Sequence, residues 1–233
     1  MHEHKQEDLH IQKNSTALII MAKEPRVGST KTRLCPPLTP EQAAQIYEAL
    51  LLDTIDIAAG IEGLDLAIAV TPSDAADYFK HITPDGTLLI PVDCPDIGLC
   101  LSQVLSELLR IGYNHVLALH SDGPTLPVAY IQEAIRTLTD KDLVFGPAED
   151  GGYYLIGLSR IHTEIFTGIE WSTEKVLSQS IFKADQSGLS VHVLPPWYDV
   201  DTANDIHRLR NEIKTLPTDT LRHTRHFLDQ CPG

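Results

Sequence analysis

The chain has 233 residues, 42% hydrophobic and 21% charged, and its 18 basic residues against 32 acidic ones give a net charge of −14. This length and composition favour a single folded domain, and the acidic balance argues against a protein that grips nucleic acid through a basic face. No apolar run reaches the ~18 residues of a membrane span, and the N-terminus lacks the apolar core of a signal peptide. The four cysteines form no C-x-x-C pair. Together these features predict a cytoplasmic protein with reduced cysteines.

The predicted elements alternate between strands and helices. Short apolar runs bounded by turn residues predict strands, and amphipathic runs at helical spacing predict helices. Thr39 and Thr202 are typical N-cap residues, each with a partner side chain three residues later. In chain order we expect a strand at 17–22, helix at 39–60, strand at 66–70, helix at 74–81, strand at 87–92, helix at 97–111, strand at 115–119, helix at 127–138, strands at 143–145 and 153–158, helix at 171–184, strand at 189–194 and helix at 203–214.

This order predicts an α/β fold, a three-layer α/β/α sandwich around a mostly parallel sheet. We expect the domain to span 16–215, with a flexible N-terminal tail at 1–15 and a C-terminal extension at 216–233, where Pro217 interrupts the helical pattern. In open parallel sheets, ligands bind beyond the carboxyl ends of the strands. The loops that follow the strands are therefore where a site is expected.

The loop after the first strand concentrates positive charge, with four cations between positions 23 and 33. Basic side chains beside flexible backbone N–H donors suit a triphosphate or diphosphate cradle, although a solvated basic loop fits the spacing equally well. A P-loop does not fit, because Pro25 and Thr30 stand where that motif requires glycine, and no G-x-G-x-x-G is present. The candidate phosphate-binding residues are Lys23, Gly28, Ser29, Thr30, Lys31 and Arg33.

Acidic residues follow two other strands. Asp122 lies just beyond the strand at 115–119, where a carboxylate could ligate Mg²⁺ or cap the next turn. Asp199 and Asp201 lie near the C-terminal end, and only one of them need face the site because alternate strand residues point to opposite faces. The D-x-D-T string around them also resembles a haloacid-dehalogenase phosphatase motif, but that motif usually lies at the first strand.

Two further segments offer polar groups. The turn at 146–154 contains Gly151 and Gly152, which allow close approach of a ligand or simply make a hairpin. Ser172 and Thr173, at the predicted start of a helix, suit either an anion or an N-cap. The chain has no G-x-S-x-G and no H-E-x-x-H, so hydrolase and zinc-protease functions lack support.

Together these segments resemble a known family. The chain carries, in order, M-A-K-x-P-x-x-G-x-x-K-T-R-L, S-D-x-P-x-L, G-P-A-x-D-G-G-Y-Y-L-I-G-L, W-S-T-x-x-V and D-V-D-T. Over about 17–210 this order resembles the bacterial "transferase 1, rSAM/selenodomain-associated" proteins. These form a DUF2064-type group of the nucleotide-diphospho-sugar transferase superfamily, with a glycosyltransferase-A fold. The chain is more distantly similar to 2-phospholactate and molybdenum-cofactor guanylyltransferases.

The resemblance implies roles for the candidate residues. Lys31 and Arg33 would hold the donor phosphates and act in catalysis with Asp122, which would ligate a metal ion, and Asp201 would be a second metal contact. The residues that would border the acceptor pocket are Asp150, Gly151, Gly152, Tyr153, Trp171, Ser172 and Thr173.

The chain departs from the family pattern at a few positions. Val27 stands where proline is expected, and Thr30 where a small apolar residue is expected. The segment His120-Ser-Asp-Gly123-Pro replaces Gly-Ser-Asp-Cys-Pro. His120 could therefore tune the donor phosphates or the acceptor, or be a tolerated substitution at a strand end.

We expect a transferase dependent on Mg²⁺ or Mn²⁺. The favoured reaction is nucleotidyl transfer from an NTP to a small phosphorylated or anionic acceptor, because a Lys/Arg loop suits a triphosphate whose pyrophosphate leaves. Asp122 also stands alone, whereas sugar transferases commonly have a D-x-D pair at that place in the chain. Glycosyl transfer from an NDP-sugar is the first alternative, and a catalytically silent nucleotide-binding protein is the second. The expected partners are thus a nucleotide and a small-molecule acceptor, without nucleic acid or a membrane.

Overall fold

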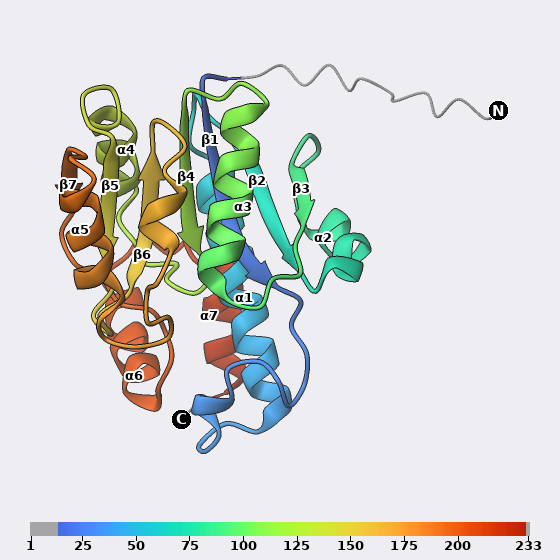
Figure 1. Cartoon of the computed structure of the whole chain (residues 1–233). Coiled ribbons are helices and arrows are strands. Elements are labelled where there is room, and N and C mark those ends of the chain that lie inside the picture. The colour runs from blue at the N-terminus through green and yellow to red at the C-terminus, as the bar shows by residue number, and fades with distance from the viewer. Residues whose placement is uncertain (1–13, 232–233) are drawn as a thin grey trace.

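A computed structural model describes residues 14–231 (Figure 1). Seven strands form one sheet in the order β3-β2-β1-β4-β6-β5-β7. Most of the predicted tail at 1–15 lies outside the described residues. The strands are β1 (Thr16–Lys23), β2 (Asp65–Thr71), β3 (Leu88–Pro91), β4 (His115–His120), β5 (Leu143–Pro147), β6 (Tyr153–Leu158) and β7 (Val191–Val193).

The helices follow the strands much as the sequence predicts. They are α1 (Pro40–Ala59), α2 (Ala76–Ile82), α3 (Ile97–Arg110), α4 (Val128–Thr137), α5 (Val176–Gln186), α6 (Ala203–Ile213) and α7 (Arg222–Gln230), with short 3₁₀ helices η1 (Thr32–Leu34), η2 (Ser73–Ala75) and η3 (Thr163–Phe166). No helix among residues 14–231 combines the length and apolar character needed to cross a membrane.

The sheet is parallel except at β6, which runs antiparallel to β4 and β5. Strand β1 pairs in parallel with both β2 and β4, so the carboxyl ends of these three strands lie at one edge (Figure 1). This arrangement confirms the predicted three-layer α/β/α sandwich.

The core has one layer on each face of the sheet because alternate strand residues point to opposite faces. Leu18 and Ile20 of β1 pack against α1, α2 and α4, in a cluster that includes Phe79. Ala17 and Ile19 pack on the other face, against α3 and α5. A third cluster joins α1 to α6 and α7 below the sheet.

The predicted helix starts hold in two places and fail in a third. Thr39 and Thr202 both form capping boxes, so α1 and α6 begin where predicted. The helix predicted from Trp171 begins only at Val176. Ser172 has a φ of 61°, a left-handed conformation that a helix cannot include. Residues 171–175 are therefore a turn.

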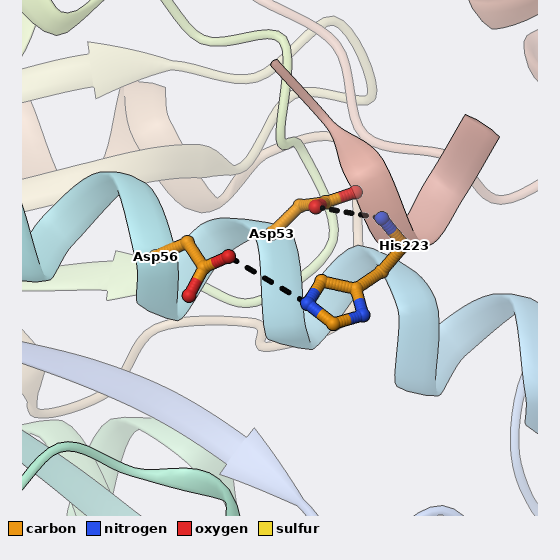
Figure 2. Close-up of side chains that lie close together, drawn as sticks. All are labelled: Asp53, Asp56 and His223. Atoms are coloured by element: carbon orange, nitrogen blue, oxygen red, sulfur yellow. Dashed lines mark hydrogen bonds and ion pairs between the residues drawn. The ribbon is translucent and has the colours of Figure 1, made fainter. Parts of the chain in front are cut away.

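Within the predicted C-terminal extension, α7 is capped by a residue of another helix (Figure 2). Leu221, at the N-cap position, has a φ of 53° and offers no side-chain cap. The buried carboxylate of Asp53, on α1, instead accepts hydrogen bonds from the backbone N–H groups of His223 (3.1 Å) and Thr224 (2.8 Å). Asp56 adds a contact of 3.6 Å to the His223 ring. The contacts of Asp53 thus tie the chain end to α1.

Replacing Asp53 with alanine should destabilise the fold. Two N–H groups at the start of α7 would lose their acceptor, one of them on the fully buried Thr224, at a cost of about 2–4 kcal/mol. Urea unfolding measures this change. D56A is the matched control, since its ion pairs are exposed and should contribute less than about 1 kcal/mol. Equal effects of the two variants would contradict the capping role.

Candidate functional site

The loops after β1 and β4 begin side by side. Met21 of β1 is in register with His120 of β4. Tyr47 of α1 bridges the two strand ends: its hydroxyl accepts a hydrogen bond from the backbone N–H of Lys23 (3.0 Å) and lies 2.8 Å from Oγ of Ser121. The helical pattern of the sequence identifies Tyr47 only as a core residue, so this bridge is not predicted.

Lys31, in the loop after β1, lies between Asp122 and Asp201 at the edge where the carboxyl ends of β1 and β4 meet. Its backbone precedes η1 with a φ of 48° and a ψ of 41°, a conformation that costs about 1–2 kcal/mol for a residue with a side chain. Its ammonium is 8% exposed and lies 2.6 Å from Oδ2 of Asp122 and 2.5 Å from Oδ1 of Asp201. The loop after the first strand and two acidic strand ends therefore meet at one buried cation.

The ion pairs control the charge states of this group. Burial alone would lower the pKa of Lys31, but the carboxylates of Asp122 and Asp201 raise it above its ordinary value. Burial alone would raise the pKa of Asp122, but Lys31 and His120 hold it well below its usual range. Lys31 is thus charged and Asp122 ionised at neutral pH.

A second group lies on the other side of Asp122. Nδ1 of His120 is 2.9 Å from Oδ1 of Asp122, and ligand atoms of His120, Asp122 and Asp199 lie within 4.8 Å of one another. Asp201 instead contacts Lys31 and, at 3.4 Å, Arg33. The structure therefore places both late aspartates near Asp122, with Asp199 in the group that offers metal-ligand atoms. The strand pattern of the sequence leaves the choice between Asp199 and Asp201 open, and the family resemblance implies Asp201 as the second metal contact.

The Asp199 carboxylate lies close to the Asp122 carboxylate and to the imidazole of His120. Burial raises the pKa of Asp199 to about 6, and the neighbouring Asp122 carboxylate adds to the effect. No hydrogen bond or ion pair within residues 14–231 reaches the Asp199 carboxylate. Two crowded carboxylates and an imidazole are a donor set that fits a divalent cation such as Mn²⁺ or Mg²⁺.

The paired departures at 120 and 123 have a steric explanation. A β-carbon at position 123 would lie 2.5 Å from Nε2 of His120, so the imidazole occupies the space that a side chain at 123 would need. Glycine at 123 is therefore required by histidine at 120. Histidine at 120 thus places an imidazole beside Asp122, in the space next to Gly123.

Two adjoining clefts open at this edge. The first, here the lysine cleft, has a volume of about 380 Å³. It brings together most of the predicted phosphate-binding and metal residues, and its polar lining consists of Lys23, Ser29, Thr30, Lys31, Thr32, Arg33, Tyr47, His120, Ser121, Asp122 and Asp201. Gly28 lies outside this lining, in a turn where its φ is 80°.

The second, here the tryptophan cleft, has a volume of about 500 Å³. Six of the seven predicted acceptor residues line it, namely Asp150, Gly152, Tyr153, Trp171, Ser172 and Thr173. Glu174, which was not predicted from the sequence, lines it as well. Gly151, the remaining predicted residue, packs against the backbone of Glu174 with a φ of 91°. The two clefts share Met21, Arg33, Ile97 and His120.

Replacing Asp199 with asparagine should stabilise the metal-free protein. The folded-state pKa exceeds the ordinary value of 3.8, so the contribution of Asp199 to stability is full below about pH 4 and is lost as the pH rises through 6. At pH 7, D199N should therefore gain roughly 1–2 kcal/mol, allowing for partial exposure. Urea unfolding in chelator at pH 7 and pH 4 checks this, with a smaller gain expected at pH 4. A loss of stability at pH 7 would show that the carboxylate is already compensated.

The comparisons with known proteins identify the family of the chain. A family model described as "Uncharacterized protein conserved in bacteria (DUF2064)" matches residues 54–173, just over half of the chain. The chain is 31% identical over 126 residues to the phosphoenolpyruvate guanylyltransferase of Mycolicibacterium vanbaalenii, a match that covers 51% of this chain and 55% of that protein. The chain thus spans about half the length of this curated relative.

Solved structures match over more of the chain. A Desulfovibrio desulfuricans G20 protein described as a nucleotide-diphospho-sugar transferase superposes with a TM-score of 0.85 and 28% identity, covering 93% of this chain and 98% of that one. The 4-diphosphocytidyl-2C-methyl-D-erythritol synthase of Anaerococcus prevotii shares the fold, with a TM-score of 0.61, 13% identity and coverages of 88% and 98%. The Desulfovibrio match confirms the predicted resemblance to nucleotide-diphospho-sugar transferases, and the Anaerococcus match shows the shared fold. The chain belongs to the DUF2064 family and has the fold of the nucleotide-diphospho-sugar transferases.

Proposed function

We propose that the protein is a metal-dependent nucleotidyltransferase that transfers a nucleotidyl group from an NTP to a small phosphorylated or anionic acceptor and releases pyrophosphate. The observation that carries this proposal is the arrangement of Lys31, Asp122 and Asp201 at the mouth of the lysine cleft. It is supported by the guanylyltransferase named among the relatives and by the cytidylyl-type synthase among the structures of the same fold.

The donor triphosphate would lie in the lysine cleft. Lys23, Lys31 and Arg33 supply positive charge along it, while Ser29 and Thr30 add polar groups. Arg33 is 75% exposed on its side chain, so its guanidinium can turn toward a ligand without a large desolvation cost. Charge neutralisation of the departing pyrophosphate by these groups would supply much of the rate.

A divalent cation would be held by Asp122 with Asp199 or Asp201, and His120 as a further ligand atom. When bound, such a cation neutralises phosphate charge and favours attack at phosphorus. The crowding of Asp199 against Asp122 supports this assignment, because a cation between two carboxylates removes their repulsion. Lys31 would remain beside Asp122 and Asp201 to meet the triphosphate.

The acceptor would lie in the tryptophan cleft. Because the two clefts share Arg33 and His120, an acceptor oxyanion at their junction would be close to the α-phosphate of the donor. That oxygen would form a bond to the α-phosphorus as the bond from this phosphorus to the bridging oxygen breaks, and the electron pair would leave on pyrophosphate. The fold holds both reactants in place, which is the main requirement of this chemistry.

Glycosyl transfer from an NDP-sugar is the second candidate. It is favoured by the description of the Desulfovibrio protein, which matches nearly the whole chain. The same lysine cleft would then hold a diphosphate, and the sugar would lie in the tryptophan cleft. A catalytically silent nucleotide-binding protein would use the same contacts without turnover.

A nucleotide panel separates the candidates. The four NTPs and the corresponding NDP-sugars are each tested with Mg²⁺, Mn²⁺ or chelator for their effect on the melting temperature. The proposal predicts metal-dependent stabilisation by at least one NTP, of about 2.7 kcal/mol when the nucleotide is present at a hundred times its dissociation constant. Stabilisation by NDP-sugars alone would instead support glycosyl transfer, and the absence of any nucleotide effect would refute both.

A further inference from the structure

The tryptophan cleft differs from the lysine cleft in charge. Among the lysine and arginine side chains of residues 14–231, only Arg33 lines it, at the junction with the lysine cleft, where His120 also lies. Its rim carries the carboxylates of Asp150 and Glu174, and both residues are exposed. One end of the tryptophan cleft therefore suits an anion, while the rest of it repels one.

The floor and wall of the tryptophan cleft are apolar and aromatic. Leu101, Ala118 and Ile156 lie in the floor, and the rings of Tyr153 and Trp171 pack edge to face with centroids 6.4 Å apart. Such a surface binds the apolar face of a ring, while hydroxyl groups at the edge of that ring can donate to carboxylates. The volume of about 500 Å³ is also that of a site for a ring-sized ligand.

The wall is fixed by two glycines. A β-carbon at Gly98, in the first turn of α3, would overlap the indole of Trp171, so the indole lies directly against the helix backbone. A β-carbon at Gly151 would overlap the backbone of Glu174, and the carbonyl of Gly151 accepts a hydrogen bond of 2.9 Å from the N–H of Leu177. The turn that presents Trp171 and Glu174 is thus docked from both sides and not free to move aside.

We propose that the acceptor has one anionic head and an uncharged, hydroxylated, ring-sized body, as in a sugar phosphate, and that Asp150 and Glu174 exclude acceptors whose body carries a second negative charge. The head would lie at Arg33, and the body would lie on Trp171 with its hydroxyl groups toward the two carboxylates. This inference rests on the proposed function for the identity of the cleft as the acceptor site, and it narrows the acceptor class.

Matched pairs of probes test the exclusion. Glucose, galactose and mannose 1-phosphates are compared with the corresponding hexuronic acid 1-phosphates, which differ only by a carboxylate on the body. Dissociation constants are measured by ligand-observed NMR without NTP, on wild type, on E174K and on E62K. Glu62 is exposed and lies outside both clefts, so E62K controls for the change in net charge.

At least one hexose phosphate should bind at least about tenfold more tightly than its uronic acid partner. E174K should reduce this ratio severalfold and E62K should preserve it, while W171A should weaken the binding of the hexose phosphate. Equal or tighter binding of the uronic acids, a ratio unchanged in E174K, or no binding of any hexose phosphate at millimolar concentration would overturn the inference.

The outcomes separate this inference from the proposed function. If the probes bind as expected but no NTP stabilises the protein in the presence of metal, the nucleotidyltransferase proposal fails and the selectivity of the cleft stands. If an NTP stabilises the protein but the probes show no discrimination, the proposed function stands and the acceptor class is wrong.

Discussion

Replacing Lys31 with methionine should both abolish catalysis and destabilise the folded protein. The ammonium lies between two carboxylates, with Asp199 close by, and its side chain is 8% exposed. Removal of one partner from such a group leaves uncompensated buried charge and costs about 3–5 kcal/mol. That loss corresponds to a drop in melting temperature of roughly 6–20 °C for a chain of this size. Pyrophosphate release should fall at least about 100-fold.

Thermal unfolding of K31M in chelator and in Mg²⁺ measures the structural part of this effect. A divalent cation should restore much of the lost stability, because it can neutralise the same carboxylates. K80M is the matched control, since Lys80 is exposed and pairs with the exposed Asp77 at 3.2 Å; it should match wild type. A stable but inactive K31M would show that Lys31 acts only on the nucleotide and does not stabilise the acidic group.

Replacing Asp122 with asparagine should cause a similarly large loss of activity but, unlike K31M, little loss of stability. Asp122 belongs to both the Lys31 pair and the group with His120 and Asp199, so its loss should remove metal-dependent stabilisation and lower activity at least about 100-fold. Lys31 keeps its pair with Asp201, and the repulsion on Asp199 is relieved. The retained Lys31–Asp201 pair and the weaker repulsion on Asp199 should together offset the stability that is lost with the Lys31–Asp122 ion pair.

The shift in melting temperature on adding Mn²⁺ or Mg²⁺ tests the Asp122 prediction. Wild type and D85N, a control at an exposed turn residue, should be stabilised by the metal, and D122N should not. A full metal response in D122N would show that the cation binds elsewhere, and the assignment of Asp122 would then be wrong.

Much of the fold could be predicted because local pattern and tertiary structure agree. The apolar run at 17–22 is the buried strand β1, and the capping residues Thr39 and Thr202 mark true helix starts. Helix α7 was not predicted because Leu221 supplies no cap of its own, and the cap comes from Asp53, far away in sequence. The predicted start of α5 is wrong because Ser172 adopts a left-handed conformation that the local sequence pattern does not indicate.

The candidate site could be predicted to the level of loops but not of atoms. The loop after β1 and the acidic strand ends do meet, as the topology of a parallel sheet requires. The choice between Asp199 and Asp201 depends on side-chain directions in an irregular segment, where strand alternation does not apply. The roles of Gly98 and Gly123 could not be predicted either. The ring of Trp171 occupies the space that a side chain at 98 would need, and the ring of His120 occupies the space that a side chain at 123 would need.

The most direct test of nucleotidyl transfer follows the label from an NTP. The protein is incubated with Mg²⁺, a pool of hexose 1-phosphates and the stabilising NTP labelled with ³²P at either the α- or the γ-phosphate. Our account predicts that the α label enters a new nucleotide product while the γ label is released as pyrophosphate, with both transfers lost in D122N. Retention of the α label in the NTP, together with nucleoside diphosphate release from an NDP-sugar, would contradict it.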